Sequence, residues 1–173
     1  MATIPCIDDE RPASSFRVLV VEDYEPFRRL VCSTLSKRPE LQVVCEVSNG
    51  VEAVRKAEEL RPDLILLDVG LPTLNGIEAA RLIRKLSPES KILFVSQESS
   101  ADVVQEALRL GALGYVAKTH VGVELLAAVE AVCHSRQFVS TGLAGHVSAG
   151  RADPQTSGRL DLGGIALPLT TGD

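Results

Sequence analysis

Short runs of apolar residues alternate along the chain with longer segments in which apolar residues recur every three or four positions. The short runs predict buried strands, and the longer periodic segments predict amphipathic helices. The predicted strands are 18–21, 41–47, 64–67, 92–95 and 114–118. Four of these five runs are apolar throughout, which is typical of parallel strands that are covered on both faces.

Five amphipathic helices are predicted, one after each strand. Their apolar residues are Phe27, Leu30, Val31 and Leu35; Val51, Val54, Ala57 and Leu60; Ile77, Ala80 and Ile83; Val103, Val104, Ala107 and Leu108; and Leu125, Leu126, Val129 and Val132. Ser99 or Ser100 is expected to cap the fourth helix, and the fifth is expected to end near Phe138. This alternation predicts an α/β, flavodoxin-like, doubly wound five-stranded parallel sheet of order 2-1-3-4-5 with five helices.

The two ends of the chain differ in composition from the segment between them. Residues 1–15 are acidic in part and lack an apolar stretch, so we expect a disordered leader and not a secretory signal. Residues 139–173 are rich in glycine and show no repeated helical face, so we expect a low-complexity, disordered tail without a recognisable output domain. The predicted domain is therefore 16–138.

Composition disfavours a protein that mainly binds nucleic acid, crosses a membrane or holds a metal through cysteines. The net charge of −5 disfavours nucleic acid as the main partner, because phosphate contacts need clustered basic residues. No apolar run approaches the roughly 18 residues that cross a membrane. Cys6, Cys32, Cys45 and Cys133 have neither CxxC nor metal-ligand spacing, so we expect free thiols in a cytoplasmic protein.

Polar residues stand where four of the five predicted strands end. Glu22 and Asp23 follow the first strand, Asp68 follows the third, Ser96 follows the fourth and Lys118 ends the fifth. In a sheet of order 2-1-3-4-5 these four strands are neighbours, and ligands bind at their carboxyl edge. We therefore expect these five side chains to converge in one crevice.

The chemistry of this set favours phosphoryl transfer. Three neighbouring carboxylates repel one another, and a divalent cation offsets the repulsion. Mg²⁺ prefers carboxylate and carbonyl oxygens. A lysine and a hydroxyl can contact a phosphoryl group, and an aspartate can accept it covalently. Transfer then needs mainly positioning and neutralisation of charge.

These residues and their neighbours resemble a known family. The matching stretches are Val-Val-Glu22-Asp23, Leu-Leu-Asp68-Val-Gly-Leu-Pro72, Asn75-Gly76, Phe-Val-Ser96 and Gly-Tyr115-Val-Ala-Lys118. Over residues 16–138 the chain resembles the response-regulator receiver domain of two-component systems, of the type usually found with LuxR-like helix-turn-helix outputs. The resemblance implies a phosphoacceptor that catalyses its own phosphotransfer and autodephosphorylation; it does not imply an enzyme in the usual sense.

The resemblance implies a role for each site residue. Asp68 would accept the phosphoryl group from a sensor histidine kinase and would also bind Mg²⁺. Asp23 would bind the metal directly, Glu22 would bind it through a water molecule, and Gly70 would contribute its backbone carbonyl.

Three further residues would respond to the phosphoryl group. Ser96 and Lys118 would contact it. Tyr115 would be the switch aromatic and would turn inward as Ser96 moves toward the phosphoryl group. The fourth helix, fifth strand and fifth helix would form the switching surface, through which a homodimer could assemble.

Two positions depart from the usual family pattern. Glu22 stands where aspartate is commoner, and its longer side chain could shift the metal. Gln97 follows Ser96, where a small residue is usual, and its bulk could restrict access to the phosphoryl group. Both departures bear on the rates of phosphorylation and dephosphorylation.

The sequence is compatible with several outputs of the signal. The chain could be a stand-alone receiver, a truncated transcriptional regulator that has lost its helix-turn-helix, or a protein-binding module that does not depend on phosphorylation. Direct DNA binding is disfavoured by the absence of a basic helix after Ser140. A hydrolase of the aspartyl-phosphate type is disfavoured by the absence of a cap domain.

Overall fold

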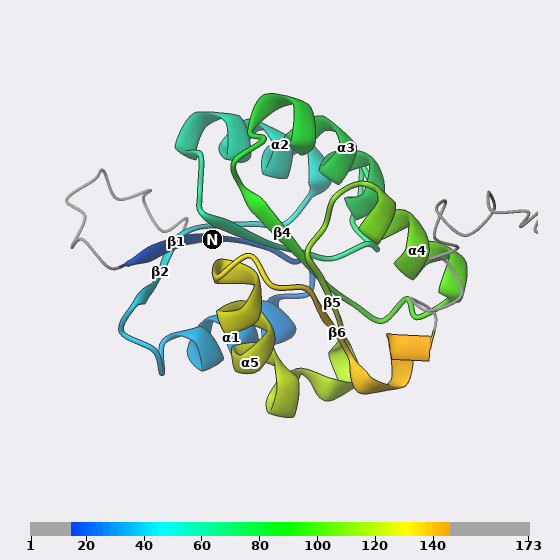
Figure 1. Ribbon diagram of the computed structural model, residues 1–173. Coiled ribbons are helices and arrows are strands. Elements are labelled where there is room, and N and C mark those ends of the chain that lie inside the picture. Colours follow the sequence, from blue (N-terminus) through cyan, green and yellow to red (C-terminus); the bar gives the residue numbers. More distant parts are fainter. Residues whose placement is uncertain (1–14, 146–173) are drawn as a thin grey trace, which may run out of the picture.

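Six parallel strands form the centre of the structure (Figure 1). The computed structural model describes residues 15–145, and the remaining residues are not described. The strands are β1 (Phe16–Val21), β2 (Leu41–Val47), β3 (Leu64–Leu67), β4 (Lys91–Ser96), β5 (Gly114–Ala117) and β6 (Phe138–Val139). Their order is β2-β1-β3-β4-β5-β6. The predicted order of five strands is confirmed, and β6 extends the sheet beyond β5.

Helices cover both faces of this sheet. They are α1 (Glu25–Leu35), α2 (Gly50–Leu60), α3 (Gly76–Leu86), α4 (Ala101–Arg109) and α5 (Val121–Cys133), with two short 3-10 turns, η1 (Lys118–His120) and η2 (Thr141–Leu143). In Figure 1, α2, α3 and α4 lie on one face, and α1 and α5 lie on the other. None of the helices within residues 15–145 is both long and apolar enough to cross a bilayer.

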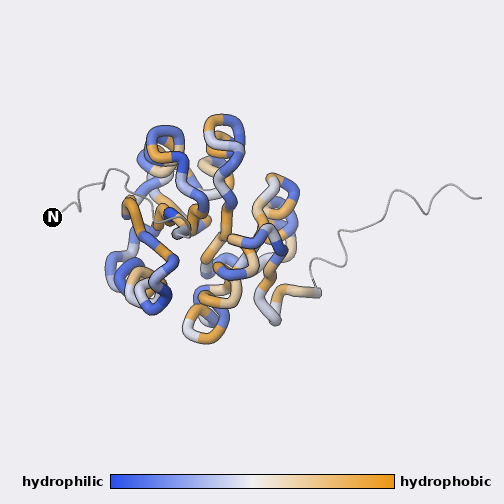
Figure 2. The backbone as a smooth tube through the Cα atoms, turned by 60° about the vertical axis from the view of Figure 1, so that its left-hand side comes forward, coloured by the Kyte–Doolittle hydropathy of each residue, from blue (hydrophilic) through white to orange (hydrophobic). Residues whose placement is uncertain are grey.

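Two apolar layers hold the helices to the sheet. Successive residues of a strand point to opposite faces. Leu19 and Val21 therefore pack in the layer beneath α2, α3 and α4, while Val18 and Val20 pack in the layer beneath α1 and α5. This explains why β1 is apolar at every position of its second half. Figure 2 shows the apolar strands at the centre and the more polar outer sides of the helices.

Side-chain caps set where three of the helices begin. Asn49 accepts a hydrogen bond from the backbone N–H of Glu52, and Asn75 does the same for Glu78. Of the two serines considered for α4, Ser100 is the cap. Each cap satisfies one of the backbone donors that a helix start leaves unpaired.

Two details of the predicted helices are wrong. Leu30 and Val51, assigned to buried helix faces, are each 51% exposed, because they lie on the outer sides of α1 and α2. The fifth helix ends at Cys133 and not near Phe138. The chain turns at Ser135, whose φ of 60° is in the left-handed region, and Phe138 then pairs with β5.

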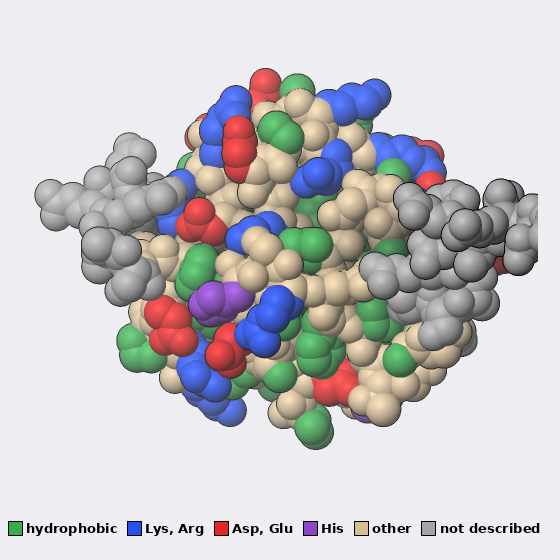
Figure 3. All heavy atoms as spheres, in the orientation of Figure 1, with side chains coloured by type: hydrophobic (Ala, Val, Ile, Leu, Met, Phe, Trp, Pro, Cys, Tyr) green, Lys and Arg blue, Asp and Glu red, His purple; other side chains and the backbone are tan. Residues whose placement is uncertain are grey.

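Charged side chains of both signs are interspersed over the face shown in Figure 3. Within the described residues, charged side chains also pair between neighbouring elements. Arg81 of α3 contacts Glu106 of α4 at 2.5 Å, and Arg61 contacts Glu89 at 3.5 Å. Exposed pairs of this kind contribute little to stability, typically about 0–1 kcal/mol.

Part of the predicted tail belongs to the folded domain. Residues 139–145 were assigned to a disordered tail, but they contain the end of β6 and the turn η2, and Leu143 is buried in the apolar layer beneath α4. Residues 146–173 of that predicted tail, and residues 1–14 of the predicted leader, lie outside the described residues.

A cluster of hydrogen bonds, which we call the Ser140 clasp, fastens this segment. It consists of Ala117, Glu124, Ser140 and Thr141. The buried Ser140 hydroxyl accepts a hydrogen bond from the Ala117 N–H at 2.9 Å and donates one to the Glu124 carboxylate at 2.5 Å. The N–H and hydroxyl of Thr141 donate to the other oxygen of Glu124, at 3.2 and 2.9 Å. Partial burial works to raise the pKa of Glu124, but these hydrogen bonds outweigh it and lower the pKa.

We expect Ser140→Ala to lower the free energy of unfolding by about 1–3 kcal/mol, because the buried Ala117 N–H loses its acceptor. Glu124→Gln should cost about 1 kcal/mol, since it replaces charge-assisted hydrogen bonds by neutral ones. Urea denaturation at pH 7 measures both.

Glu130→Gln, an exposed change on the same helix, is the matched control and should stay within about 0.5 kcal/mol of the parent. A depressed folded-state pKa stabilises the fold above the unfolded pKa, and this stabilisation is lost as the pH falls through the folded value. The difference between the parent and Glu124→Gln should therefore shrink as the pH falls below the ordinary value of 4.5. An undiminished difference in acid would contradict the clasp.

Candidate functional site

Three carboxylates meet at the carboxyl edge of the sheet. Glu22 and Asp23 follow β1, Asp68 follows β3, and single oxygens of the three side chains lie within 4.8 Å of one another. Glu22 and Asp68 are buried, whereas Asp23 is exposed. The cluster therefore has two carboxylates inside the protein and one at the surface.

Backbone hydrogen bonds hold both acidic segments in place. The N–H of Asp68 donates to the carbonyl of Val21, and that of Glu22 donates to the carbonyl of Val47. The Asp68 side chain accepts a hydrogen bond from the N–H of Gly70 at 3.2 Å. Gly76 must be glycine because a Cβ atom there would lie 1.9 Å from the carbonyl oxygen of Asp68.

Lys118 joins the two buried carboxylates. It follows β5 directly, and its Nζ lies 2.8 Å from Asp68 Oδ2 and 2.7 Å from Glu22 Oε2. Its side chain is only 12% exposed. One ammonium thus bridges two carboxylates that would otherwise face each other across a poorly solvated gap.

The pKa values follow from this arrangement. Burial raises the pKa of Glu22, against the opposing effect of hydrogen bonds from Lys118 and the Tyr24 N–H. Burial works to lower the pKa of Lys118, but its bonds to Asp68 and Glu22 outweigh that effect and raise the pKa. Lys118 is therefore a cation at neutral pH.

The charges of the cluster suit a divalent cation. When ionised, three carboxylates and one ammonium leave two negative charges uncompensated within the cluster. A hard divalent cation would neutralise them, and carboxylate oxygens are its preferred ligands. The exposed Asp23 gives such an ion a route from solvent.

The hydroxyls of Ser96 and Tyr115 both form hydrogen bonds with the backbone of Glu98. Ser96 ends β4, and its hydroxyl accepts a hydrogen bond from the N–H of Glu98 at 3.2 Å. Tyr115 is fully buried against Phe94, and its hydroxyl donates to the carbonyl of Glu98. Burial raises the pKa of Tyr115 to about 12. The Tyr115 ring thus points inward, while Gln97 is exposed.

Two residues of α1 reach the site and were not assigned to it from the sequence. Arg28 donates a hydrogen bond to the carbonyl of Glu22 at 2.8 Å. The Phe27 ring lies beneath the Lys118 ammonium, 4.6 Å from Nζ to the ring centroid. Their position four to six residues after the acidic pair was the only signal in the sequence.

The loop between β3 and α3 contains a strained residue. Thr73 has a φ of 70°, and the N–H of Leu74 donates to the carbonyl of Pro72. This bond closes a γ-turn with a positive φ, a rare and strained conformation. Left-handed φ is unusual for any residue with a Cβ atom, and more so for a β-branched one.

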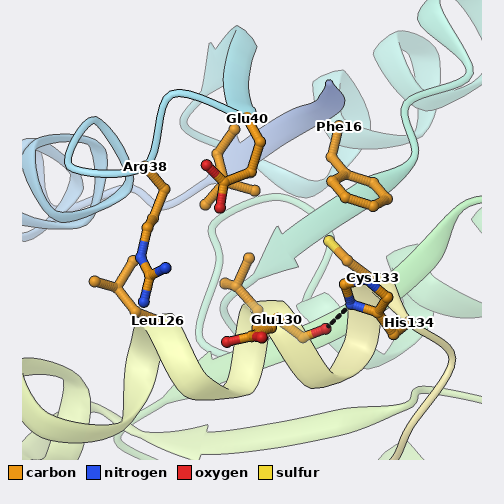
Figure 4. Close-up of a pocket in the computed structure, with 9 residues that line it drawn as sticks. Phe16, Arg38, Glu40, Leu126, Glu130, Cys133 and His134 are labelled. Carbon is orange, nitrogen blue, oxygen red and sulfur yellow. Dashed lines mark hydrogen bonds between the residues drawn. The ribbon is translucent and has the colours of Figure 1, made fainter. Parts of the chain in front are cut away.

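A pocket lies at the opposite edge of the sheet, between the start of β1, the segment before β2 and the end of α5 (Figure 4). Phe16, Leu126 and Cys133 line it, and His134 Nδ1 donates to the carbonyl of Glu130 at its rim. Burial raises the pKa of Cys133 to about 11, so its thiol is protonated at neutral pH and a poor nucleophile. The reactive groups named above are all at the other edge.

Comparison with known proteins identifies the family. The model of the response regulator receiver domain matches residues 18–130, so the chain belongs to this family. The transcriptional regulatory protein LiaR of Bacillus subtilis is 34% identical over 76% of this chain. A protein-glutamate methylesterase/protein-glutamine glutaminase of Carboxydothermus hydrogenoformans is 38% identical over 73% of it. The crystal structure of a LuxR-family two-component response regulator from Aurantimonas superposes with a TM-score of 0.75, at 32% identity, over 80% of this chain and 99% of that one.

The shared region is only part of the relatives. The match spans 62% of LiaR and 38% of the methylesterase. Proteins with different activities therefore share this domain. The chain thus contains the receiver domain of two-component response regulators, as the resemblance in sequence implied.

Strain at Thr73 can be tested by substitution. We expect Thr73→Gly to raise the free energy of unfolding by up to about 1 kcal/mol, because glycine adopts a positive φ without steric cost. Thr73→Ala is the matched control: it keeps a Cβ atom and so should gain less than Thr73→Gly. Urea denaturation measures both, and an equal gain in the two variants would contradict the strain at this position.

Proposed function

We propose that Asp68 accepts a phosphoryl group from a sensor histidine kinase and that the domain signals by the resulting change of conformation. The observation that carries the proposal is the contact of Asp68 with the Lys118 ammonium at 2.8 Å, inside a cluster of three carboxylates. An ion pair alone is a common structural feature. A buried aspartate with a cation on one side and acidic metal-ligand groups on the other is what a covalent phosphoacceptor needs.

The transfer is an in-line displacement at phosphorus. An Asp68 carboxylate oxygen forms the new O–P bond while the P–N bond of the phosphohistidine breaks, and the bonding electron pair stays on the imidazole nitrogen. Lys118 and the Ser96 hydroxyl contact the oxygens of the transferred group. In autodephosphorylation, water attacks phosphorus, the Asp68 O–P bond breaks, and the carboxylate and inorganic phosphate are released.

We propose Mg²⁺ as the cofactor of this site. Asp23 and Asp68 would hold it directly, the carbonyl of Gly70 would be the third protein ligand, and Glu22 would reach it through a water molecule. When bound, Mg²⁺ supplies positive charge that neutralises the oxygens of the transferring group. The residual negative charge of the cluster supports this assignment.

Switching is proposed to run from Ser96 to Tyr115. Both residues bond to Glu98, so a shift of Ser96 toward a phosphoryl group would alter the loop that holds the tyrosine hydroxyl. The surface of α4, β5 and α5 would carry the change to a partner, including a second copy of the chain. We place this signalling in the cytoplasm, where sensor kinases present their phosphohistidine.

The output is proposed only as protein contact by the described domain. LiaR is a transcriptional regulatory protein and the Carboxydothermus relative is a methylesterase, so the domain does not dictate one output. A truncated transcriptional regulator and a binding module independent of phosphorylation remain the alternatives, and phosphorylation of Asp68 by a small donor separates the second from the main proposal.

Mg²⁺ should stabilise the domain by mass action. At about ten times its dissociation constant, the ion should raise the free energy of unfolding by about 1.4 kcal/mol. Asp23→Asn should remove most of this effect, whereas Asp102→Asn, an exposed change on α4, should leave it intact. Thermal unfolding with and without MgCl₂ measures the effect. Equal stabilisation of all three proteins would argue against the acidic cluster as the site.

Phosphorylation by a small donor tests Asp68. With acetyl phosphate and Mg²⁺, intact-mass measurement should show the parent and Asp102→Asn gaining one phosphoryl group each, and Asp68→Asn gaining none. If folded parent protein gains nothing, the phosphoacceptor proposal fails, and a binding module independent of phosphorylation becomes the better interpretation. A gain in Asp68→Asn would place the acceptor elsewhere.

A further inference from the structure

The Lys118 ammonium is enclosed on three sides. Two sides are the carboxylates of Asp68 and Glu22, at 2.8 and 2.7 Å. The third is the face of the Phe27 ring, whose centroid is 4.6 Å from Nζ. This distance is within the roughly 6 Å at which a cation is attracted by the negative face of an aromatic ring.

The start of α1 fixes the position of this ring. Pro26 occupies the first turn of the helix, where its fixed φ suits a helix start. Arg28 ties the same turn to the carbonyl of Glu22. The Phe27 ring also packs against the apolar layer beneath α1 and α5. The ring and the acidic pair are therefore held by one short segment of chain.

From this contact we propose that Phe27 is a positioning residue for phosphoryl transfer, whose ring face holds the Lys118 ammonium where it meets the phosphoryl group on Asp68. The inference rests on the proposed function of Asp68. During the reaction an ionic partner of the ammonium changes, because the Asp68 carboxylate becomes an acyl phosphate. The ring takes no part in the chemistry, so it remains in place throughout. The Phe27 ring forms no covalent bond and carries no net charge. It therefore does not displace the phosphoryl oxygens from the Lys118 ammonium.

A ring that only fills space would act through its volume and not through its charge distribution. Replacement of Phe27 by phenylalanines with one, two and three ring fluorines separates the two roles, since fluorine withdraws charge from the ring face with little change of size. We expect the initial rate of phosphorylation by acetyl phosphate, followed by intact mass, to fall with each fluorine. The total fall should be about three- to tenfold.

Several control variants accompany the series. In a Lys118→Met background the rate should be lower throughout and independent of the fluorines, because the cation is absent. Fluorination of Phe16, at the far end of β1, should change nothing. Phe27→Tyr should keep most of the rate, whereas Phe27→Leu should lose as much as the trifluorinated ring. Thermal unfolding of each protein confirms that it is folded.

Two outcomes are distinguishable. If the parent is phosphorylated normally and the rate does not depend on the fluorines, the positioning role is overturned and Phe27 is a packing residue. The same conclusion follows if the fluorine dependence persists in Lys118→Met. If the parent takes no phosphoryl group, the proposed function of Asp68 fails, and the role of Phe27 in transfer fails with it.

Discussion

The site depends on two buried carboxylates that share one ammonium. Glu22 and Asp68 would repel each other in a poorly solvated crevice, and leaving either without a partner would be costly. Lys118 follows the end of β5 directly, and its ammonium lies between the two carboxylates and offsets their repulsion. A parallel sheet makes the meeting unavoidable, since the ends of β1, β3 and β5 all reach one edge. Because residue 76 is glycine, the start of α3 can pass close to the backbone of Asp68 without displacing it.

Much of the fold could be predicted because the determining signals are local. Strands apolar on both sides, such as β3, and side-chain caps such as Ser100 lie within a few residues of the structure that they specify. The strand β6 could not be predicted in this way. Two residues give no periodicity, and their position depends on the free edge of β5 and on Glu124, 16 residues from Ser140. Tertiary partners, and not local preference, decide that Phe138 continues the sheet and not the helix.

The same distinction applies to the site. Glu22, Asp68 and Lys118 could be assigned because a charged residue directly after a buried strand is costly to place there unless it meets a partner or a ligand. Phe27 was assigned only to a helix face, because an aromatic ring in an amphipathic pattern looks like any other core residue. Its contact with an ammonium 91 positions along the chain exists only after folding. The left-handed φ of Thr73 likewise gives no sign in a residue type that normally avoids it.

The hydrogen bond from Ala117 to Ser140 has a thermodynamic consequence. Ala117 is covalently joined to Lys118, so the clasped segment and the acidic site share a strand end. Coupling between two sites is reciprocal: the free energy by which one ligand alters the binding of another is the same in both directions. If a phosphoryl group on Asp68 changes the free energy with which a partner binds residues 138–143, that partner changes the free energy of the phosphorylated state by the same amount. The stability of the phosphorylated state therefore depends on the domain and also on what residues 138–143 contact.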